Sequence, residues 1–133
     1  MPSKPVNGDQ RGWIIPIGGA EDKETNPRIL ARFVELSGGT DADIVVIPTA
    51  SRLKDSGTRY EELFRGMGAS RVEVLDFDTR RDCQEEGRLA RLAEASGIFF
   101  TGGNQLRLST ILGGTQVARS IRSRNAQGVT VAG

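Results

Sequence analysis

The chain has 133 residues, with 18 Lys and Arg against 17 Asp and Glu, and its formal net charge is +1. This length allows one domain with a modest core, and a near-neutral chain has no overall field that would draw it to nucleic acid or to an anionic membrane. There is no His and a single Cys. Within these residues, that composition excludes a Ser-His-Asp triad, a Cys-His pair, an internal disulfide and a His-rich or Cys-rich metal site. We therefore expect no cofactor and no metal.

The amino-terminal segment predicts neither export nor membrane insertion. Residues 1–11 are polar and lack the apolar stretch of a signal peptide. No apolar run approaches the ~20 residues of a membrane span. We expect a disordered leader over residues 1–11, a single α/β domain over residues 12–133, and a cytoplasmic location.

Five short apolar runs, rich in β-branched and aromatic residues, predict strands at residues 13–17, 44–47, 72–75, 98–100 and 129–132. Their continuous apolar character is typical of strands that are covered on both faces. Their starts recur every 26 to 31 residues. That interval accommodates a strand and a crossover helix, so parallel βαβ units follow.

The segments between these runs predict helices at residues 27–37, 56–67, 83–95, 105–112 and 115–125. In the first, Asn26 suits the N-cap, Pro27 the first helical position and Gly38 the end. The residues expected to face inward from the first three helices are Ile29, Leu30, Phe33, Val34, Leu36, Tyr60, Leu63, Phe64, Met67, Leu89, Leu92 and Ala93. The fold class is therefore α/β, a three-layer open and mostly parallel sheet of the flavodoxin-like kind.

The last predicted strand, residues 129–132, is followed only by Gly133. In an open parallel sheet a strand is normally followed by a helix that covers one face. We therefore expect a fold cut after its fifth strand, with no element to cover that strand. The alternative is a finished fold whose fifth strand is an exposed edge, although edge strands usually carry a charge or a Pro and this one has neither.

Ligands of open α/β sheets bind beyond the carboxyl ends of the strands. After the fourth strand, Gly102 and Gly103 precede Asn104 and Gln105. A glycine pair between a strand and a helix lets backbone N–H groups point at a phosphate, a carboxylate or a developing oxyanion. The alternative is an ordinary helix entry with an Asn cap.

The loops after the other strands carry weaker signals. Glu21, Asp22 and Lys23 form either a site or an ion-paired helix entry, and the Ser51 hydroxyl most often caps a turn. No dinucleotide fingerprint and no P-loop occurs.

Four segments together resemble the cyanophycinases. They are residues 15–23 (IPIGGAEDK), 46–51 (VIPTAS), 99–108 (FFTGGNQLRL) and 112–115 (LGGT), and the resemblance covers residues 12–133. The family consists of serine peptidases related to dipeptidase E, on a scaffold like that of class I glutamine amidotransferases. Its substrate is cyanophycin, a poly-aspartate backbone with arginine attached to each side chain, which it hydrolyses to β-Asp-Arg dipeptides.

The resemblance implies that Gly133 is the first glycine of a nucleophile elbow, with the serine two positions beyond it. The family's His and its acidic partner also lie further on, so the 133-residue chain alone is expected to be inactive. Gly102 would supply an oxyanion-hole N–H. The substrate-binding candidates are Gly103, Asn104 and Gln105, with Glu21, Asp22, Lys23 and Ser51 as further candidates. The implied partners are cyanophycin or a β-aspartyl peptide and, in the full-length form, a second copy of the chain.

Two other function classes are open. A receiver-like phosphoacceptor domain would use Glu21 and Asp22, Asp76 or Asp78, and Thr101, although no Lys follows the fifth strand. A noncatalytic binding module would keep the ligand-binding loop without the chemistry.

Overall fold

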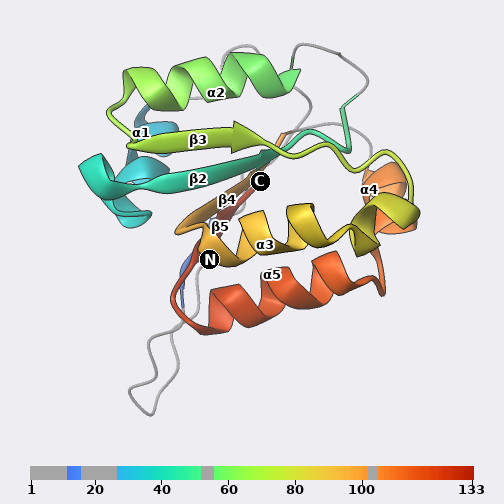
Figure 1. Ribbon diagram of the computed structural model, residues 1–133. Coiled ribbons are helices and arrows are strands. Elements are labelled where there is room, and N and C mark those ends of the chain that lie inside the picture. The colour runs from blue at the N-terminus through green and yellow to red at the C-terminus, as the bar shows by residue number, and fades with distance from the viewer. Residues whose placement is uncertain (1–11, 16–26, 52–55, 102–104) are drawn as a thin grey trace.

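The computed structural model describes residues 12–15, 27–51, 56–101 and 105–133 (Figure 1). Five strands form one sheet: β1 (Ile14–Ile15), β2 (Asp43–Ile47), β3 (Arg71–Val74), β4 (Gly97–Phe100) and β5 (Thr130–Ala132). Every pairing is parallel, and the order across the sheet is β1-β5-β4-β2-β3. The expected class, a three-layer open parallel sheet, is confirmed, with a strand order that differs from the 2-1-3-4-5 order of flavodoxin itself.

Strand β5 lies inside the sheet, between β1 and β4, so the expectation of an uncovered or exposed fifth strand is wrong. On one face, Ala132 belongs to the cluster packed under helix α1 (Pro27–Leu36), and the Thr130 hydroxyl donates to the Leu36 carbonyl at 3.2 Å. On the other face, Val129 and Val131 pack into the opposite cluster. The helices that cover β5 come from earlier in the chain. An interpretation that takes the strands one at a time could not predict which helices these are.

Helices cover both faces of the sheet (Figure 1). Helices α1 and α2 (Ser56–Gly66) lie on one face, and α3 (Glu86–Glu94) and α5 (Gln116–Ala126) lie on the other. Helix α4 (Gln105–Leu112) lies beyond the carboxyl end of β4, and two short 3-10 helices, η1 (Gly39–Asp41) and η2 (Arg81–Gln84), complete the described elements. The loops that matter for function therefore emerge at the edge where the strands end.

Each face of the sheet has its own apolar core, because alternate residues of a strand point to opposite faces. The core under α1 and α2 contains an aromatic cluster in which the Phe64 ring centroid lies 5.3 Å from that of Phe33 and 5.0 Å from that of Phe99. The core under α3 and α5 includes Val45, Ile47, Ile98, Leu92, Val117 and Ile121. The strands are thus covered on both faces, as their continuous apolar runs predict.

The predicted helices are correct in place and number, with three local differences. The expected helix at residues 83–95 is divided, because Glu85 is extended and caps α3 by accepting from the Gly87 N–H. Ile29, Leu63 and Ala93, which were expected to face inward, are exposed. Arg91, which lies two residues before Ala93, is buried instead.

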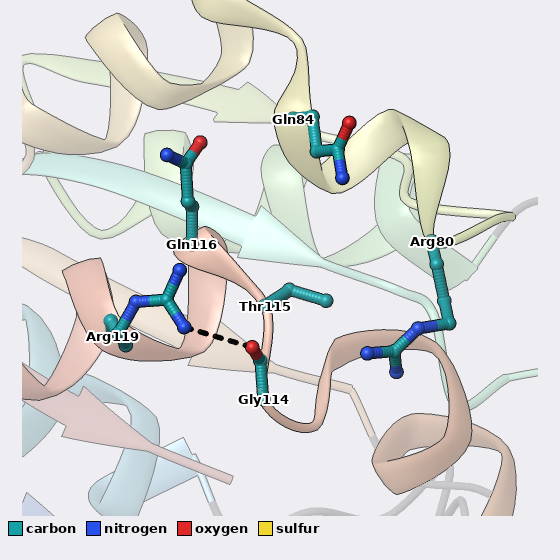
Figure 2. A pocket seen from close by; sticks show the side chains of 6 residues that line it. All are labelled: Arg80, Gln84, Gly114, Thr115, Gln116 and Arg119. Atoms are coloured by element: carbon teal, nitrogen blue, oxygen red, sulfur yellow. Dashed lines mark hydrogen bonds between the residues drawn. The ribbon is translucent and has the colours of Figure 1, made fainter.

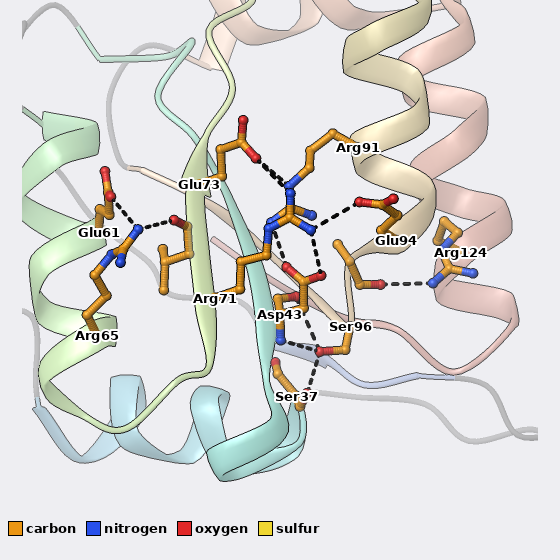
Figure 3. Close-up of polar contacts among 12 residues, drawn as sticks. Ser37, Asp43, Glu61, Arg65, Arg71, Glu73, Arg91, Glu94, Ser96 and Arg124 are labelled. Carbon is orange, nitrogen blue, oxygen red and sulfur yellow. Dashed lines mark hydrogen bonds and ion pairs between the residues drawn. The ribbon is translucent and has the colours of Figure 1, made fainter.

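Arg91 is buried at the amino-terminal side of the sheet, where it joins two strands to α3 (Figure 3). Its guanidinium donates to the carboxylate of Asp43 on β2 at 2.6 Å and to that of Glu73 on β3 at 2.5 Å. Arg71, which is half exposed, pairs with the carboxylate of Glu94 at 3.2 Å beside it. A buried charge needs such partners. This network lies at the amino-terminal edge of the sheet, opposite the loops that follow the carboxyl ends of the strands.

Candidate functional site at the carboxyl edge of the sheet

All five strands are parallel, so their carboxyl ends lie along one edge, where ligands of open α/β sheets bind. The described residues at this edge are 48–51 after β2, 75–80 after β3, Thr101 after β4 and Gly133 after β5. The loop after β1 and residues 102–104 lie outside the described part of the chain. The candidate site is therefore described from the residues that flank these two segments.

Arg107 of α4 holds two loops of this edge together. Its Nε donates to the carbonyl oxygen of Thr49 at 2.8 Å, and its Nη2 lies 3.8 Å from an Asp78 carboxylate oxygen. The Thr49 hydroxyl in turn donates to the carbonyl oxygen of Phe77 at 3.0 Å. The loops after β2 and β3 and the helix after β4 are therefore joined. Arg107 belongs to the sequence motif at residues 99–108, but the motif does not indicate these contacts.

Thr101 carries an unused hydroxyl at this edge. Its backbone N–H continues the sheet by donating to the Ile47 carbonyl at 3.2 Å. The residue is 3% exposed, and its hydroxyl has no hydrogen-bond partner among the residues that the structure describes. Because a buried polar group without a partner costs free energy, such a group needs an explanation. Thr101 directly precedes the glycine pair, so its hydroxyl is available to a ligand or to chain packed over this edge.

Gly133 follows β5 in close contact with the end of β4. A Cβ added to Gly133 would lie 2.6 Å from the Cβ of Phe100 and 2.8 Å from its carbonyl oxygen. Its φ of +144° is also one that L side chains rarely adopt. Only glycine fits this position, and the chain leaves β5 directly beside the chain that leaves β4.

Most of the predicted site residues lie outside the described part of the chain: Gly102, Gly103, Asn104, Glu21, Asp22 and Lys23. Gln105 is the first residue of α4, as expected. Ser51 is half-buried, and its N–H donates to the Pro48 carbonyl at 2.9 Å, which closes the turn after β2. The structure therefore brings Ser51 and Gln105 to the same edge and does not test the functional assignments.

Two titratable groups near this edge have shifted pKa values. The pKa of Asp82 is lowered, mainly because its carboxylate accepts the N–H of Asp78 at 2.9 Å, with the Thr79 N–H at 3.1 Å and the Arg88 charge adding to the effect. Burial raises the pKa of the Cys83 thiol, which donates to the Ile111 carbonyl at 3.6 Å. Cys83 is thus a buried, protonated thiol with no nucleophilic character.

The strand order argues against the receiver-like alternative. The flavodoxin-like order 2-1-3-4-5, which receiver domains share, makes the first and third strands neighbours. Here β1 and β3 are the two outer strands of the sheet, on opposite sides of β5, β4 and β2. Glu21 and Asp22, the acidic residues expected after β1, lie outside the described part of the chain.

The described residues hold neither a metal-binding cluster nor a membrane-spanning helix. Within the described ranges, no three His, Cys, Asp or Glu side chains gather as they would around a metal ion. None of the described helices is long and apolar enough to cross a membrane.

The fold defines an α/β protein whose loops gather at the carboxyl edge of a parallel sheet. More narrowly, the chain belongs to peptidase family S51, whose family profile matches residues 14–133. Two solved structures share the fold: a peptidase from an acI-B1 actinobacterium (TM-score 0.74, 21% identity, 95% of this chain and 55% of that one) and a putative peptidase E protein from Listeria monocytogenes (TM-score 0.65, 19% identity, 92% and 58%).

The curated relatives that match are described as cyanophycinases. Those from Synechococcus elongatus and Thermosynechococcus vestitus are each 42% identical over 124 residues, which is 92% of this chain and 38% of each relative. The protein from Trichormus variabilis is 43% identical over 122 residues, which is 90% of this chain and 41% of the relative. The chain therefore spans about two fifths of the length of these relatives.

Proposed function

We propose that residues 12–133 are the amino-terminal part of a cyanophycinase-like serine peptidase that hydrolyses cyanophycin to β-Asp-Arg dipeptides. The support from sequence is the membership of peptidase family S51 and the identity of 42 to 43% to cyanophycinases over nine tenths of the chain. A cytoplasmic location and a homodimeric full-length form stay predictions of the same proposal.

The observation that carries this proposal is the pairing of β4 with β5. Phe99 lies opposite Ala132, and Gly133 contacts Phe100. If the register of the described pairs continued beyond them, Gly102 would pair with the position two residues after Gly133. This is the position at which a nucleophile elbow that begins at Gly133 would carry its serine.

In the proposed reaction, the histidine expected beyond residue 133 takes the serine hydroxyl proton, the serine oxygen attacks the peptide carbonyl carbon and the carbonyl oxygen becomes an oxyanion. The C–N bond then breaks, the leaving amine takes that proton, and water hydrolyses the acyl-enzyme. The Gly102 N–H donates to that oxyanion, and Gly103, Asn104 and Gln105 bind the substrate beside it. Glu21, Asp22, Lys23 and Ser51 are further substrate-binding candidates on the neighbouring loops. Arg107 and Thr49 join α4 to the loop after β2 and have no catalytic role in this proposal.

We expect the 133-residue chain alone to be inactive, because it contains no His and does not include the position proposed for the serine. Purified chain is incubated with cyanophycin, and β-Asp-Arg is measured by mass spectrometry. Release of the dipeptide by the chain alone would refute the proposed division of the active site.

A complementation experiment tests the peptidase assignment. The part of the Thermosynechococcus vestitus relative that follows the region matching this chain is produced separately and mixed with it. We expect a complex that releases β-Asp-Arg, and no release when the proposed serine is changed to Ala. A complex that forms without any hydrolysis contradicts the peptidase assignment and favours a noncatalytic binding module.

A further inference from the structure

A polar hollow lies between η2 and the turn that joins α4 to α5 (Figure 2). Its volume is about 320 Å³, which is enough for a small ligand. It is lined by Arg80, Gln84, Gly114, Thr115, Gln116 and Arg119. Two of these six side chains are cationic, two are primary amides, and none is acidic. The lining is therefore rich in hydrogen-bond donors and positive charge.

The two guanidinium groups converge on Gly114 from opposite sides (Figure 2). Nη1 of Arg119 donates to the Gly114 carbonyl oxygen at 2.9 Å. Nη2 of Arg80 lies 3.9 Å from the point that a Cβ on Gly114 would occupy. Gly114 has a φ of +73° and no side chain, so the space between the two arginines stays open.

Backbone contacts hold Arg80 in this orientation, and its charge is not neutralised locally. Nη1 of Arg80 donates to the Thr110 carbonyl oxygen at 2.9 Å, which leaves its other N–H groups for a ligand. Among the described residues, neither Arg80 nor Arg119 forms an ion pair. Two like charges held about one small space repel each other unless an anion lies between them.

The amino terminus of α5 does not by itself form this ligand-binding hollow. The Thr115 hydroxyl already donates to the Leu112 carbonyl at 2.6 Å and accepts the Ala118 N–H at 3.4 Å. The donors that remain belong to the arginine and glutamine side chains, which come from η2 and α5. Planar guanidinium groups suit the paired oxygens of carboxylates and phosphates.

We propose that this hollow binds an oxyanion, and that two guanidinium charges favour a dianionic phosphate group over a single carboxylate. The site is independent of the peptidase reaction, because it uses none of the residues assigned to peptide hydrolysis. The 133-residue chain can therefore be tested without any measurement of hydrolysis.

Inorganic phosphate is titrated into the isotopically labelled chain at constant ionic strength, and the backbone amide signals are followed by NMR. We expect saturable shifts centred on residues 114–116. In R80Q and in R119Q, we expect affinity to fall about tenfold, because each loses a charge-assisted hydrogen bond. R80K and R119K keep the charge and should recover part of the binding. A parallel titration with acetate distinguishes a phosphate from a carboxylate ligand.

The matched control is R59Q, which removes the same charge from exposed Arg59 on α2, over the opposite face of the sheet. We expect phosphate affinity in R59Q to equal that of the unchanged chain, and every variant to melt cooperatively. Equal losses in R59Q, or shifts scattered over the surface, would overturn the proposal by revealing only nonspecific attraction. Acetate that binds at residues 114–116 as tightly as phosphate would overturn the preference for a dianion.

Discussion

Nε of Arg107 donates to the carbonyl oxygen of Thr49 at 2.8 Å, so the helix that follows β4 is tied to the loop that follows β2. The two residues are 58 positions apart in sequence. Both lie at the edge of the sheet where the candidate site is built. This contact therefore joins α4 to the loop after β2.

Changing Arg107 to Ala should lower the free energy of unfolding by about 1 kcal/mol, because the Thr49 carbonyl loses a charged donor. Hydrogen exchange at residues 49–51 should become faster. D78N is the control, since it removes only the 3.8 Å ion pair between exposed groups and should cost less than about 0.5 kcal/mol. A larger loss in D78N than in R107A would show that the ion pair, and not the carbonyl contact, holds the loops.

Changing Arg91 to Ala should lower the free energy of unfolding by about 2 to 3 kcal/mol, as measured by urea denaturation. The variant leaves the Asp43 and Glu73 carboxylates close together without the cation that joins β2, β3 and α3. R71A is the matched control, because the Arg71 side chain is 53% exposed and its ion pairs are screened by water. Equal losses of unfolding free energy in R91A and R71A would contradict the idea that burial strengthens the ion pairs of Arg91.

Changing Gly97 to Ala should destabilise the chain by about 1 to 3 kcal/mol. An added Cβ would lie 2.2 Å from the Ser37 Oγ and 2.8 Å from the Ser37 Cβ, which are both held at the end of α1. G66A is the opposite case, because nothing lies within 4 Å of its added Cβ and Gly66 is helical. We expect G66A to raise the melting temperature, through an unfolded-state effect of up to about 1 kcal/mol.

Asp82 should make the stability of the chain fall in acid. Its pKa is lowered in the folded state, so the unfolded chain binds a proton first as the pH decreases. The contribution is therefore complete above the ordinary carboxyl pKa of about 4 and is lost as the pH falls through the folded-state value. Urea midpoints between pH 7 and pH 2.5 measure it. D82N should have a shallower acid decline than the unchanged chain, and an equal decline in both would contradict the role of Asp82.

The local elements were predictable because each depends on neighbours in sequence. Continuous β-branched runs predicted β2, β3 and β4 to within a residue at each end, and the helix predicted at residues 105–112 coincides with α4. The break at Glu85 was missed, because an extended residue that caps the next helix leaves no periodic signal. Ala93 and Leu63 were placed inward by helical periodicity, whereas the actual angle of each helix on the sheet exposes them.

The sequence predicts the location of the candidate site but not the contacts within it. Parallel strands put Ser51, Thr101, Gln105 and Gly133 at one edge, and that much follows from strand spacing. The contact of Arg107 with Thr49 was not predictable, because a surface arginine on an amphipathic helix has many possible partners. The convergence of Arg80 and Arg119 on Gly114 was also missed, since the two arginines lie on separate elements.

By itself, the sequence determined the identity and spacing of the elements, the parallel direction of the strands and the absence of any histidine chemistry in these 133 residues. Only the tertiary structure decided the strand order. The burial of β5 between β1 and β4, the separation of β1 from β3 and the close contact of Gly133 with Phe100 all follow from that order. Strand order depends on contacts between residues that are distant in the chain. The hydrophobic pattern of a strand does not indicate which other strands it will pair with.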